Sequence, residues 1–253
     1  MNKYDNILVT GGCGFIGTNF IKYVLNKTNY NGNIINVDAL TYSGNKLNLQ
    51  DIYNRFGEKR YFFYKVDISD KLKIKNVFDK HNIDCIIHFA AETHVDRSIE
   101  KPAGFIKTNI VGTYNLLEIA KEKWGEGGSS NKRFHHISTD EVYGSLGHDG
   151  YFYENTCYDP RSPYSASKAS SDHLVKSFFH TFGLPVTISN CSNNYGPYQF
   201  PKKLIPLMIL NMLNGKALPV YGKGENVRDW LFVEDHCSAV WKIVNEVSLT
   251  ELI

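Results

Sequence analysis

The stretch Gly11-Gly12-Cys13-Gly14-Phe15-Ile16-Gly17 decides the fold, because it joins a strand-like run to a helical pattern. The apolar run Asn6–Thr10 precedes it, and a helical pattern over Gly14–Leu25 begins within it. In such a unit the first glycine permits a tight turn, the second lets a pyrophosphate approach the backbone, and the third lets the helix pack closely. The helix N-terminus also offers unpaired N–H groups to phosphate oxygens. We therefore predict that Gly11, Gly14 and Gly17 form a dinucleotide-binding loop.

Acidic residues end the next two strand-like runs. Asp38 closes the run Asn33–Asp38, about 20 residues after the glycine loop, where a carboxylate can accept both adenosine ribose hydroxyls. Such a carboxylate would repel a 2′-phosphate, so Asp38 favours NAD over NADP as the cofactor. Asp67 follows the run Tyr61–Val66 and has two interpretations: a hydrogen bond to the adenine amino group, or a cap on the next turn. The sequence leaves both open.

Strand-like and helix-like segments alternate along the first 189 residues. The further strand-like runs are Cys85–Phe89, Arg133–Ser138 and Pro185–Ser189, and the further helical patterns are Lys71–His81, Thr108–Lys123 and Ser165–Phe182. Alternation of this kind predicts an α/β fold, a Rossmann-type doubly wound parallel sheet with helices on both faces. Ligands of such sheets bind at the carboxyl ends of the strands.

The alternation of strand-like and helix-like segments ends after Ser189. A segment rich in Asn, Tyr and Pro is followed by a short helical pattern, Leu207–Leu213. We predict an NAD-binding Rossmann domain over residues 1–189. Residues 190–253 would form a partial, incomplete C-terminal substrate lobe, with some segments returning to the Rossmann domain.

Composition narrows the class of protein. The net charge is +2 without a basic block, which argues against a nucleic-acid partner. No apolar stretch approaches the roughly 18 residues of a membrane helix, and the N-terminal residues do not read as a signal peptide. The five cysteines contain no CxxC pair and indicate free buried thiols, so we expect a cytoplasmic protein. Adjacent His135 and His136 should face opposite ways in a strand, so we expect no metal site.

Tyr164 and Lys168 stand four residues apart where a helix begins, so their side chains should share one helix face. The Lys168 ammonium and a positively charged nicotinamide would favour tyrosinate, lowering a pKa that starts near 10. The Tyr164 phenolate could then take a proton from a sugar or alcohol hydroxyl while hydride passes to NAD⁺.

A hydroxyl and two carboxyls, Thr139, Asp140 and Glu141, end the fifth strand-like run. They have two interpretations. The first is capping of a helix N-terminus by Thr139 or Asp140. The second is a general acid beside a general base, with one carboxyl kept protonated by its neighbour and by burial.

Together these motifs are specific enough to indicate a family. The chain resembles the dTDP-glucose 4,6-dehydratases, which are extended short-chain dehydrogenase/reductases. The matching stretches are Thr10–Gly17, Phe89–Ser98, Thr108–Thr113, Ser138–Gly144, Tyr164–Leu174, Asn190–Pro197 and Arg228–Leu231.

The resemblance implies a redox-neutral mechanism that uses NAD as a retained cofactor. Tyr164, assisted by Thr139 and Lys168, would deprotonate the glucose 4-hydroxyl as hydride passes from C4 to NAD⁺. Glu141 would then remove the C5 proton, and Asp140 would protonate the departing 6-hydroxyl. Return of hydride to C6 would give dTDP-4-keto-6-deoxyglucose, a precursor of deoxysugars such as rhamnose.

The resemblance also implies the binding residues. Besides Tyr164 and Lys168, the cofactor residues would be Gly11, Gly14, Phe15, Ile16, Gly17, Asp38, Thr41, Asp67, Ile68, Ala90, Ala91, Thr108 and Asn194. The nucleotide-sugar residues would be Thr93, Thr139, Asn193, Lys203, Leu204, Pro219, Tyr221 and Arg228. Arg228 could grip the diphosphate, or form a salt bridge with a nearby acid. The helices over Thr108–Lys123 and Ser165–Phe182 resemble those of a homodimer contact, although their aromatic stripe could equally belong to the core.

Two alternatives stay open. The first is another nucleotide-sugar enzyme, a UDP-sugar dehydratase or a 4-epimerase; an epimerase would need Tyr164 and Lys168 but not the acid–base pair. The second is a catalytically silent nucleotide-binding protein, because members of the resembled family run further than Ile253. We therefore expect the 253-residue chain to bind NAD but to turn over weakly or not at all.

Overall fold

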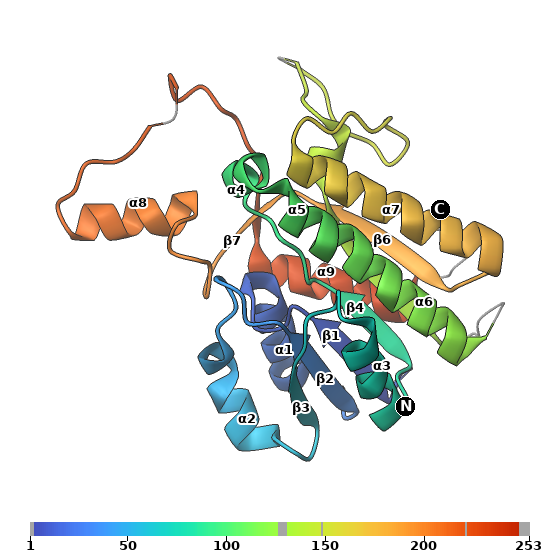
Figure 1. Cartoon of the computed structure of the whole chain (residues 1–253). Helices are drawn as coiled ribbons and strands as arrows, with labels where there is room; N and C mark the ends of the chain where they lie inside the picture. The colour runs from blue at the N-terminus through green and yellow to red at the C-terminus, as the bar shows by residue number, and fades with distance from the viewer. Residues whose placement is uncertain (1–2, 126–130, 148, 221, 248–253) are drawn as a thin grey trace.

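The computed structural model describes residues 3–125, 131–147, 149–220 and 222–247. A six-stranded parallel sheet forms its centre (Figure 1). Its strands are β1 (Asn6–Thr10), β2 (Asn33–Asp38), β3 (Tyr61–Lys65), β4 (Cys85–His88), β5 (Arg133–Thr139) and β6 (Val186–Cys191). They lie in the order β3-β2-β1-β4-β5-β6. From β1 to β3 the strands are added toward one edge of the sheet, and from β4 to β6 toward the other edge. The predicted α/β Rossmann-type sheet is confirmed.

Helices cover both faces of the sheet, and each face has its own core. One face carries α1 (Phe15–Lys27), α2 (Gln50–Phe56) and α9 (Val233–Glu246), and the other carries α3 (Lys71–Lys80), α6 (Thr113–Trp124) and α7 (Pro163–Phe182). The first core buries Phe20, Ile52 and Val240, and the second buries Leu116 and Val175. Because both faces are covered, the central strands β2, β1, β4 and β5 are buried almost throughout their length.

The helix predicted over Thr108–Lys123 has a more complex form. The short helices α4 (Val95–Glu100) and α5 (Pro102–Phe105) lead into a π-helical segment, η2 (Ile106–Gly112), which continues as α6. A Cβ on Gly112 would lie 2.6 Å from the side chain of Ile68, a residue that lines the cavity described below. Because Gly112 has no side chain, this segment can lie close to Ile68. Widened turns of this type occur frequently at functional sites.

The predicted aromatic stripe of α7 belongs largely to the core. Val175 and Phe178 are buried, while Leu174, Phe179 and Phe182 are half-buried and pack on the same core cluster. The stripe therefore has an intramolecular role, and the predicted homodimer stays a prediction.

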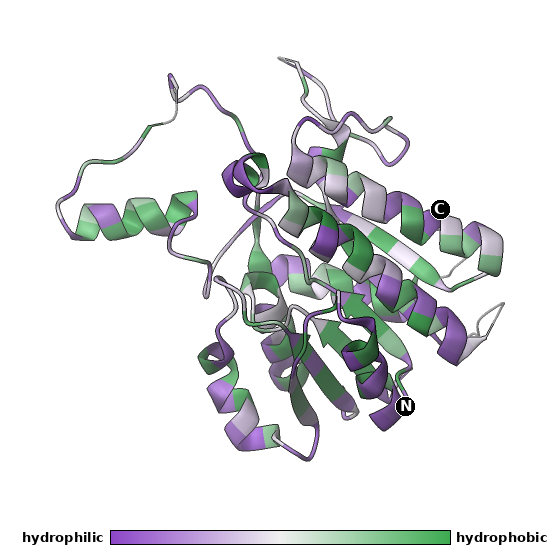
Figure 2. Cartoon of the chain, viewed as in Figure 1, coloured by the Kyte–Doolittle hydropathy of each residue, from purple (hydrophilic) through white to green (hydrophobic). Residues whose placement is uncertain are grey.

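The C-terminal segment divides into two parts. β7 (Asn193–Tyr195) and β8 (Trp230–Phe232) form a two-stranded parallel sheet, and α8 (Leu204–Leu213) stands away from the body of the molecule (Figure 1). α8 is strongly apolar, as its largely green ribbon in Figure 2 shows. It nevertheless contains no buried residue. In contrast, α9 returns to the Rossmann sheet and packs along α1, where Trp241 contacts Phe20 with ring centroids 6.4 Å apart.

The thiols are mostly, but not entirely, where the sequence predicted them. Cys13, Cys85 and Cys237 are buried and Cys191 is half-buried, but Cys157 is exposed on the loop between β5 and α7, so the prediction of buried thiols is wrong for Cys157. No helix within the described residues has the length and apolar character needed to cross a membrane.

Candidate active site

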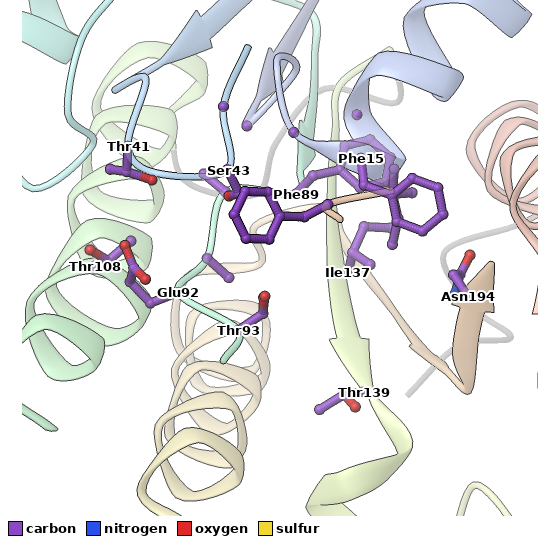
Figure 3. A pocket seen from close by; sticks show the side chains of 18 of the residues that line it. Phe15, Thr41, Ser43, Phe89, Glu92, Thr93, Thr108, Ile137, Thr139 and Asn194 are labelled. Carbon is purple, nitrogen blue, oxygen red and sulfur yellow. The ribbon is translucent and has the colours of Figure 1, made fainter. Parts of the chain in front are cut away.

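A cavity of about 390 Å³ runs along the carboxyl ends of the parallel strands. Side chains from α1, β5, β7 and the loop after β2 surround it, among them Phe15, Thr41, Thr139 and Asn194 (Figure 3). Every residue that the sequence predicted for the cofactor or for catalysis lines this one cavity. The structure therefore brings together residues that are up to about 180 positions apart in the chain because strand ends share one edge of a parallel sheet.

The glycine loop follows β1 and leaves no room for side chains. Gly11 has a φ of +71°, which favours glycine, and a Cβ there would lie 2.7 Å from the Ala90 backbone nitrogen. A Cβ on Gly17 would lie 2.3 Å from the Gly11 carbonyl oxygen. These contacts give Gly11 and Gly17 the turning and packing roles that the sequence predicted, and Gly14 forms the N-cap of α1 at the cavity wall.

Asp38 lies at the end of β2 with its carboxylate against the glycine loop. The backbone N–H of Cys13 donates to one oxygen at 2.9 Å, and that of Leu40 donates to the other at 2.7 Å. Burial raises the pKa of Asp38, while the two backbone hydrogen bonds act in the opposite direction. The carboxylate thus lines the cavity and also determines the course of the backbone around it.

Asp67 adopts the capping arrangement that the sequence left open. Its Oδ1 accepts hydrogen bonds from the backbone N–H of Ser69 at 2.9 Å and from the Ser69 hydroxyl at 2.8 Å. Its side chain nevertheless lines the cavity, and Lys107 lies 3.7 Å from the second oxygen. Capping and ligand contact are therefore compatible at this position.

Tyr164 and Lys168 lie on the first two turns of α7. A capping box between Ser162 and Ser165 begins this helix, with Pro163 at its first position. Tyr164 is buried, and burial together with the nearby Glu141 raises its pKa, while an interaction with Thr139 acts in the opposite direction. The expected lowering of the tyrosine pKa is therefore absent from the protein by itself.

The position of Lys168 explains this difference. Its Nζ donates to the Ile137 carbonyl oxygen at 2.8 Å and lies 3.2 Å from His136 Nε2. Burial lowers the pKa of Lys168 to about 8. Lys168 is thus held by β5 rather than by Tyr164, and only additional positive charge in the cavity would favour tyrosinate.

Thr139, Asp140 and Glu141 show both features that the sequence allowed. Thr139 caps the 3₁₀ turn η3 (Asp140–Tyr143) by accepting from the Glu141 backbone N–H at 3.3 Å, and its hydroxyl donates to Asp140 Oδ1 at 3.2 Å. Burial raises the pKa of Asp140, and burial followed by the Asp140 charge raises the pKa of Glu141. The two carboxyls therefore compete for ionisation, which suits an acid paired with a base.

The residues predicted for the nucleotide sugar are placed less uniformly. Thr93, Thr139, Asn193, Lys203 and Leu204 line the cavity, and Lys203 Nζ lies 3.5 Å from the Thr93 carbonyl oxygen. Pro219 and Arg228 are exposed and lie outside its lining, whereas Tyr221 falls outside the described residues.

Arg228 also lacks the alternative role that the sequence allowed. Its Nη1 donates to the Val227 carbonyl oxygen at 2.7 Å, and no ion pair joins it to an acid within the described part of the chain. The positive charge of Arg228 nonetheless lowers the pKa values of Asp140 and Glu141, although burial raises both by a larger amount.

Several cavity residues were missed by the sequence reasoning. They include Phe89, Glu92, Gln199, Phe200 and Trp230. Phe89 and Glu92 follow β4 directly, so their place after a buried strand is a signal that could have identified them. Gln199 and Trp230 have no such signal. No group of three metal-binding side chains occurs among the described residues, in agreement with His135 and His136 having separate partners.

Comparison with known proteins agrees with this geometry. A family model described as GDP-mannose 4,6 dehydratase matches residues 8–251. The dTDP-glucose 4,6-dehydratase 1 of Escherichia coli K12 is 54% identical over 252 residues, a match that covers 95% of this chain and 68% of that protein.

Two solved structures are similar over the same region. The dTDP-glucose 4,6-dehydratase of Bacillus anthracis, in complex with NAD, has a TM-score of 0.84 and 47% identity, covering 95% of this chain and 71% of that one. The dTDP-glucose 4,6-dehydratase of Streptomyces venezuelae, also with NAD bound, has a TM-score of 0.87 and 42% identity, covering 95% and 72%. The chain belongs to the dTDP-glucose 4,6-dehydratase family.

Proposed function

We propose that the chain binds NAD and dehydrates dTDP-glucose to dTDP-4-keto-6-deoxyglucose. One observation carries this proposal: Asp140 and Glu141 line the same cavity as Tyr164 and the glycine loop. A dehydration needs a base for the C5 proton and an acid for the departing hydroxyl, close to a site that exchanges hydride. The adjacent carboxyls would meet that need.

The cavity suits NAD. Gly11 and Gly17 leave the backbone open to a pyrophosphate, and the Asp38 carboxylate would receive the adenosine ribose hydroxyls. When bound, NAD⁺ supplies a hydride acceptor that can return the hydride later, together with positive charge near Tyr164. The relatives of Bacillus anthracis and Streptomyces venezuelae were solved with NAD, which supports the assignment.

The side chains would then act in sequence. Tyr164, with Thr139 beside it, would take the proton of the 4-hydroxyl as hydride leaves C4. The resulting 4-keto group makes the C5 proton acidic. Glu141 would remove that proton, and Asp140 would give its proton to the 6-hydroxyl, which leaves as water. Return of the hydride to C6, with return of the proton from Glu141 to C5, would make the overall change the loss of one water molecule.

The main alternative is a nucleotide-sugar 4-epimerase, which would use the same tyrosine and lysine. Epimerisation at C4 removes no proton from C5 and expels no hydroxyl. The raised pKa values of both Asp140 and Glu141, caused first by burial, would serve no purpose in that reaction. A buried acid–base pair therefore favours dehydration.

The test combines substrate turnover with a separate binding measurement. Titration with NAD comes first, followed by incubation with dTDP-glucose and measurement of the alkali-induced absorbance of a 4-keto-6-deoxy sugar. We expect NAD binding and a weak absorbance from the 253-residue chain, with UDP-glucose as the matched substrate control. A 4-epimer without a ketone would reject the dehydratase, and NAD binding without any turnover would favour a nucleotide-binding role.

We further propose a domain division and a homodimer. The Rossmann domain would comprise residues 1–189 together with α9, while β7, β8 and α8 would belong to the nucleotide-sugar lobe. The homodimer would form through α6 and α7. Tyr114 on α6 is exposed, and so is Val111 on the π-helical segment η2 that precedes α6. Sedimentation equilibrium tests this, because a monomer at all protein concentrations would exclude the homodimer.

A further inference from the structure

Asp172 lies one helical turn after Lys168 on α7 and is completely buried. Its Oδ2 accepts hydrogen bonds from the Ser138 hydroxyl at 2.7 Å and the Tyr158 hydroxyl at 3.0 Å. Its Oδ1 lies 3.2 Å from His136 Nε2. Asp172 is not among the residues that line the cavity, so any effect on chemistry must pass through a neighbour.

The neighbour that connects Asp172 to the cavity is His136. The same ring nitrogen that lies 3.2 Å from Asp172 Oδ1 also lies 3.2 Å from Lys168 Nζ. Lys168 does line the cavity. A buried anion and a buried cation are therefore linked through one imidazole nitrogen.

The pKa shifts of Asp172 and Lys168 are consistent with this link. Burial acts to raise the pKa of Asp172, but His136, Lys168 and Ser138 together lower it below the usual value. For Lys168, burial lowers the pKa to about 8, and Asp172 is the strongest opposing influence. A buried ammonium without a compensating anion would lose its proton more easily.

The ring of His136 lies between the two charged groups and is itself uncharged. Burial lowers the pKa of His136 to about 4, so the ring is neutral at neutral pH. An ammonium can only donate, so in its hydrogen bond with Lys168 Nζ the Nε2 atom of His136 accepts. Asp172 Oδ1 and His136 Nδ1 have no hydrogen-bond partner within the described residues, so the Asp172 carboxylate acts on Lys168 through its charge, across a neutral ring.

The contacts of Lys168 hold its ammonium at the cavity wall. Its Nζ donates to the Ile137 carbonyl oxygen at 2.8 Å and to His136 Nε2 at 3.2 Å. An ammonium has three N–H groups, so one stays available for the cavity.

We propose that Asp172 is a positioning residue for the dehydratase: its buried carboxylate, acting across the His136 ring, keeps Lys168 charged at the cavity wall. This role rests on the proposed function for its catalytic meaning, but the charge of Lys168 is a property of the chain itself. Other titratable groups also face this cluster. They are His88 on β4, Cys191 at the end of β6, Tyr143 and Glu141 on η3, Tyr158 on the following loop, and Tyr164 on α7.

The test compares two substitutions that remove different properties of the cluster. Asp172→Asn keeps the shape but removes the charge, and Tyr158→Phe removes one hydrogen bond to Asp172 and keeps the charge. Turnover of dTDP-glucose is followed from neutral to alkaline pH. We expect activity to be lost as Lys168 deprotonates, and Asp172→Asn to move this alkaline limb down by about one pH unit or more. Tyr158→Phe should leave the limb in its original place.

Two outcomes would contradict the proposal: an unmoved limb in Asp172→Asn, or an equal shift in Tyr158→Phe, which would indicate a purely structural anchor. A second measurement needs no turnover. NMR titration of labelled lysine side chains, with Lys168→Met to assign the signal, should show that Lys168 is charged at neutral pH in the parent chain and loses its proton at a lower pH in Asp172→Asn. An uncharged Lys168 in the parent chain, or an unchanged titration in Asp172→Asn, overturns the proposal even if dTDP-glucose is the substrate. If dTDP-glucose is not turned over, the proposed function fails, while the titration of Lys168 still decides on Asp172.

Discussion

The backbone N–H of Cys13 donates a 2.9 Å hydrogen bond to the carboxylate of Asp38, so the residue that ends β2 also holds the glycine loop after β1. The same carboxylate lines the cavity. Asp38 therefore has two roles in one place: it shapes the loop expected to receive the pyrophosphate, and it presents an acceptor to the adenosine ribose.

Asp38→Asn should weaken NAD binding by about tenfold or more, because hydrogen bonds to a charged acceptor contribute roughly 1.5 to 3 kcal/mol. The amide also removes the charge that repels a 2′-phosphate, so the preference for NAD over NADP should narrow. Calorimetric titration with each cofactor measures both effects. Asp51→Asn is a matched control, since Asp51 is an exposed carboxyl on α2 that pairs with Lys22. Equal NAD affinity in Asp38→Asn and the parent chain would reject the role of Asp38.

Gly17→Ala should distort the glycine loop. Its Cβ would meet the Gly11 carbonyl oxygen at 2.3 Å and the Gly12 Cα at 2.7 Å, and both are backbone atoms that cannot rotate away. We expect a destabilisation of about 1 to 3 kcal/mol and loss of NAD binding. Urea unfolding and cofactor titration measure the two effects.

The matched control is Gly104→Ala on α5, where a Cβ meets nothing within 4 Å. Alanine favours a helix more than glycine does, so this variant should be unchanged or more stable by up to about 1 kcal/mol. Similar losses in both variants would show that the close contacts at Gly17 are not responsible.

Glu141→Gln should separate hydride transfer from elimination. Tyr164 and Thr139 are left in place, so we expect oxidation at C4 to persist and bound NADH to accumulate, while ketone product falls by a factor of about 100 or more. Rapid-mixing absorbance measures NADH. The rate at which the C5 proton exchanges with deuterated water measures how far the base has been lost. If the C5 proton exchanges at the parental rate, Glu141 is not that base.

The buried histidines should make the protein less stable in mild acid. Burial lowers the pKa of His135 to about 3 and those of His136 and His236 to about 4, below the ordinary 6.5. The unfolded chain therefore binds more protons than the folded chain between these values. Stability is fully present above pH 6.5 and is lost as the pH falls toward 4, by roughly 1.4 kcal/mol per pH unit for each histidine.

Urea unfolding at about pH 7.5 and about pH 5.5 measures this dependence. His236→Gln, which replaces a ring bonded through Nδ1 to Asn194 at 2.8 Å, should flatten the slope. A free energy of unfolding that stays level across this range would contradict the prediction.

The sequence determined the Rossmann sheet and most of the cavity. Strand periodicity and the glycine loop are local patterns, and parallel strands necessarily bring their carboxyl ends to one edge. Residues at or just beyond the carboxyl end of a buried strand, such as Asp38, Ala90 and Thr139, were therefore predictable as cavity residues. The four-residue spacing of Tyr164 and Lys168 likewise follows from helix geometry.

Only the tertiary structure decided which distant side chains meet. α9 has buried residues at helical spacing, Val233, Cys237, Val240 and Val244, but the surface on which they pack belongs to α1 and is remote in the sequence. The link from Lys168 through His136 to Asp172 likewise needs β5 and α7 in contact, and it gives Lys168 an environment that its spacing from Tyr164 could not reveal. Periodicity reports local conformation, whereas burial and charge compensation arise only when separate elements pack together.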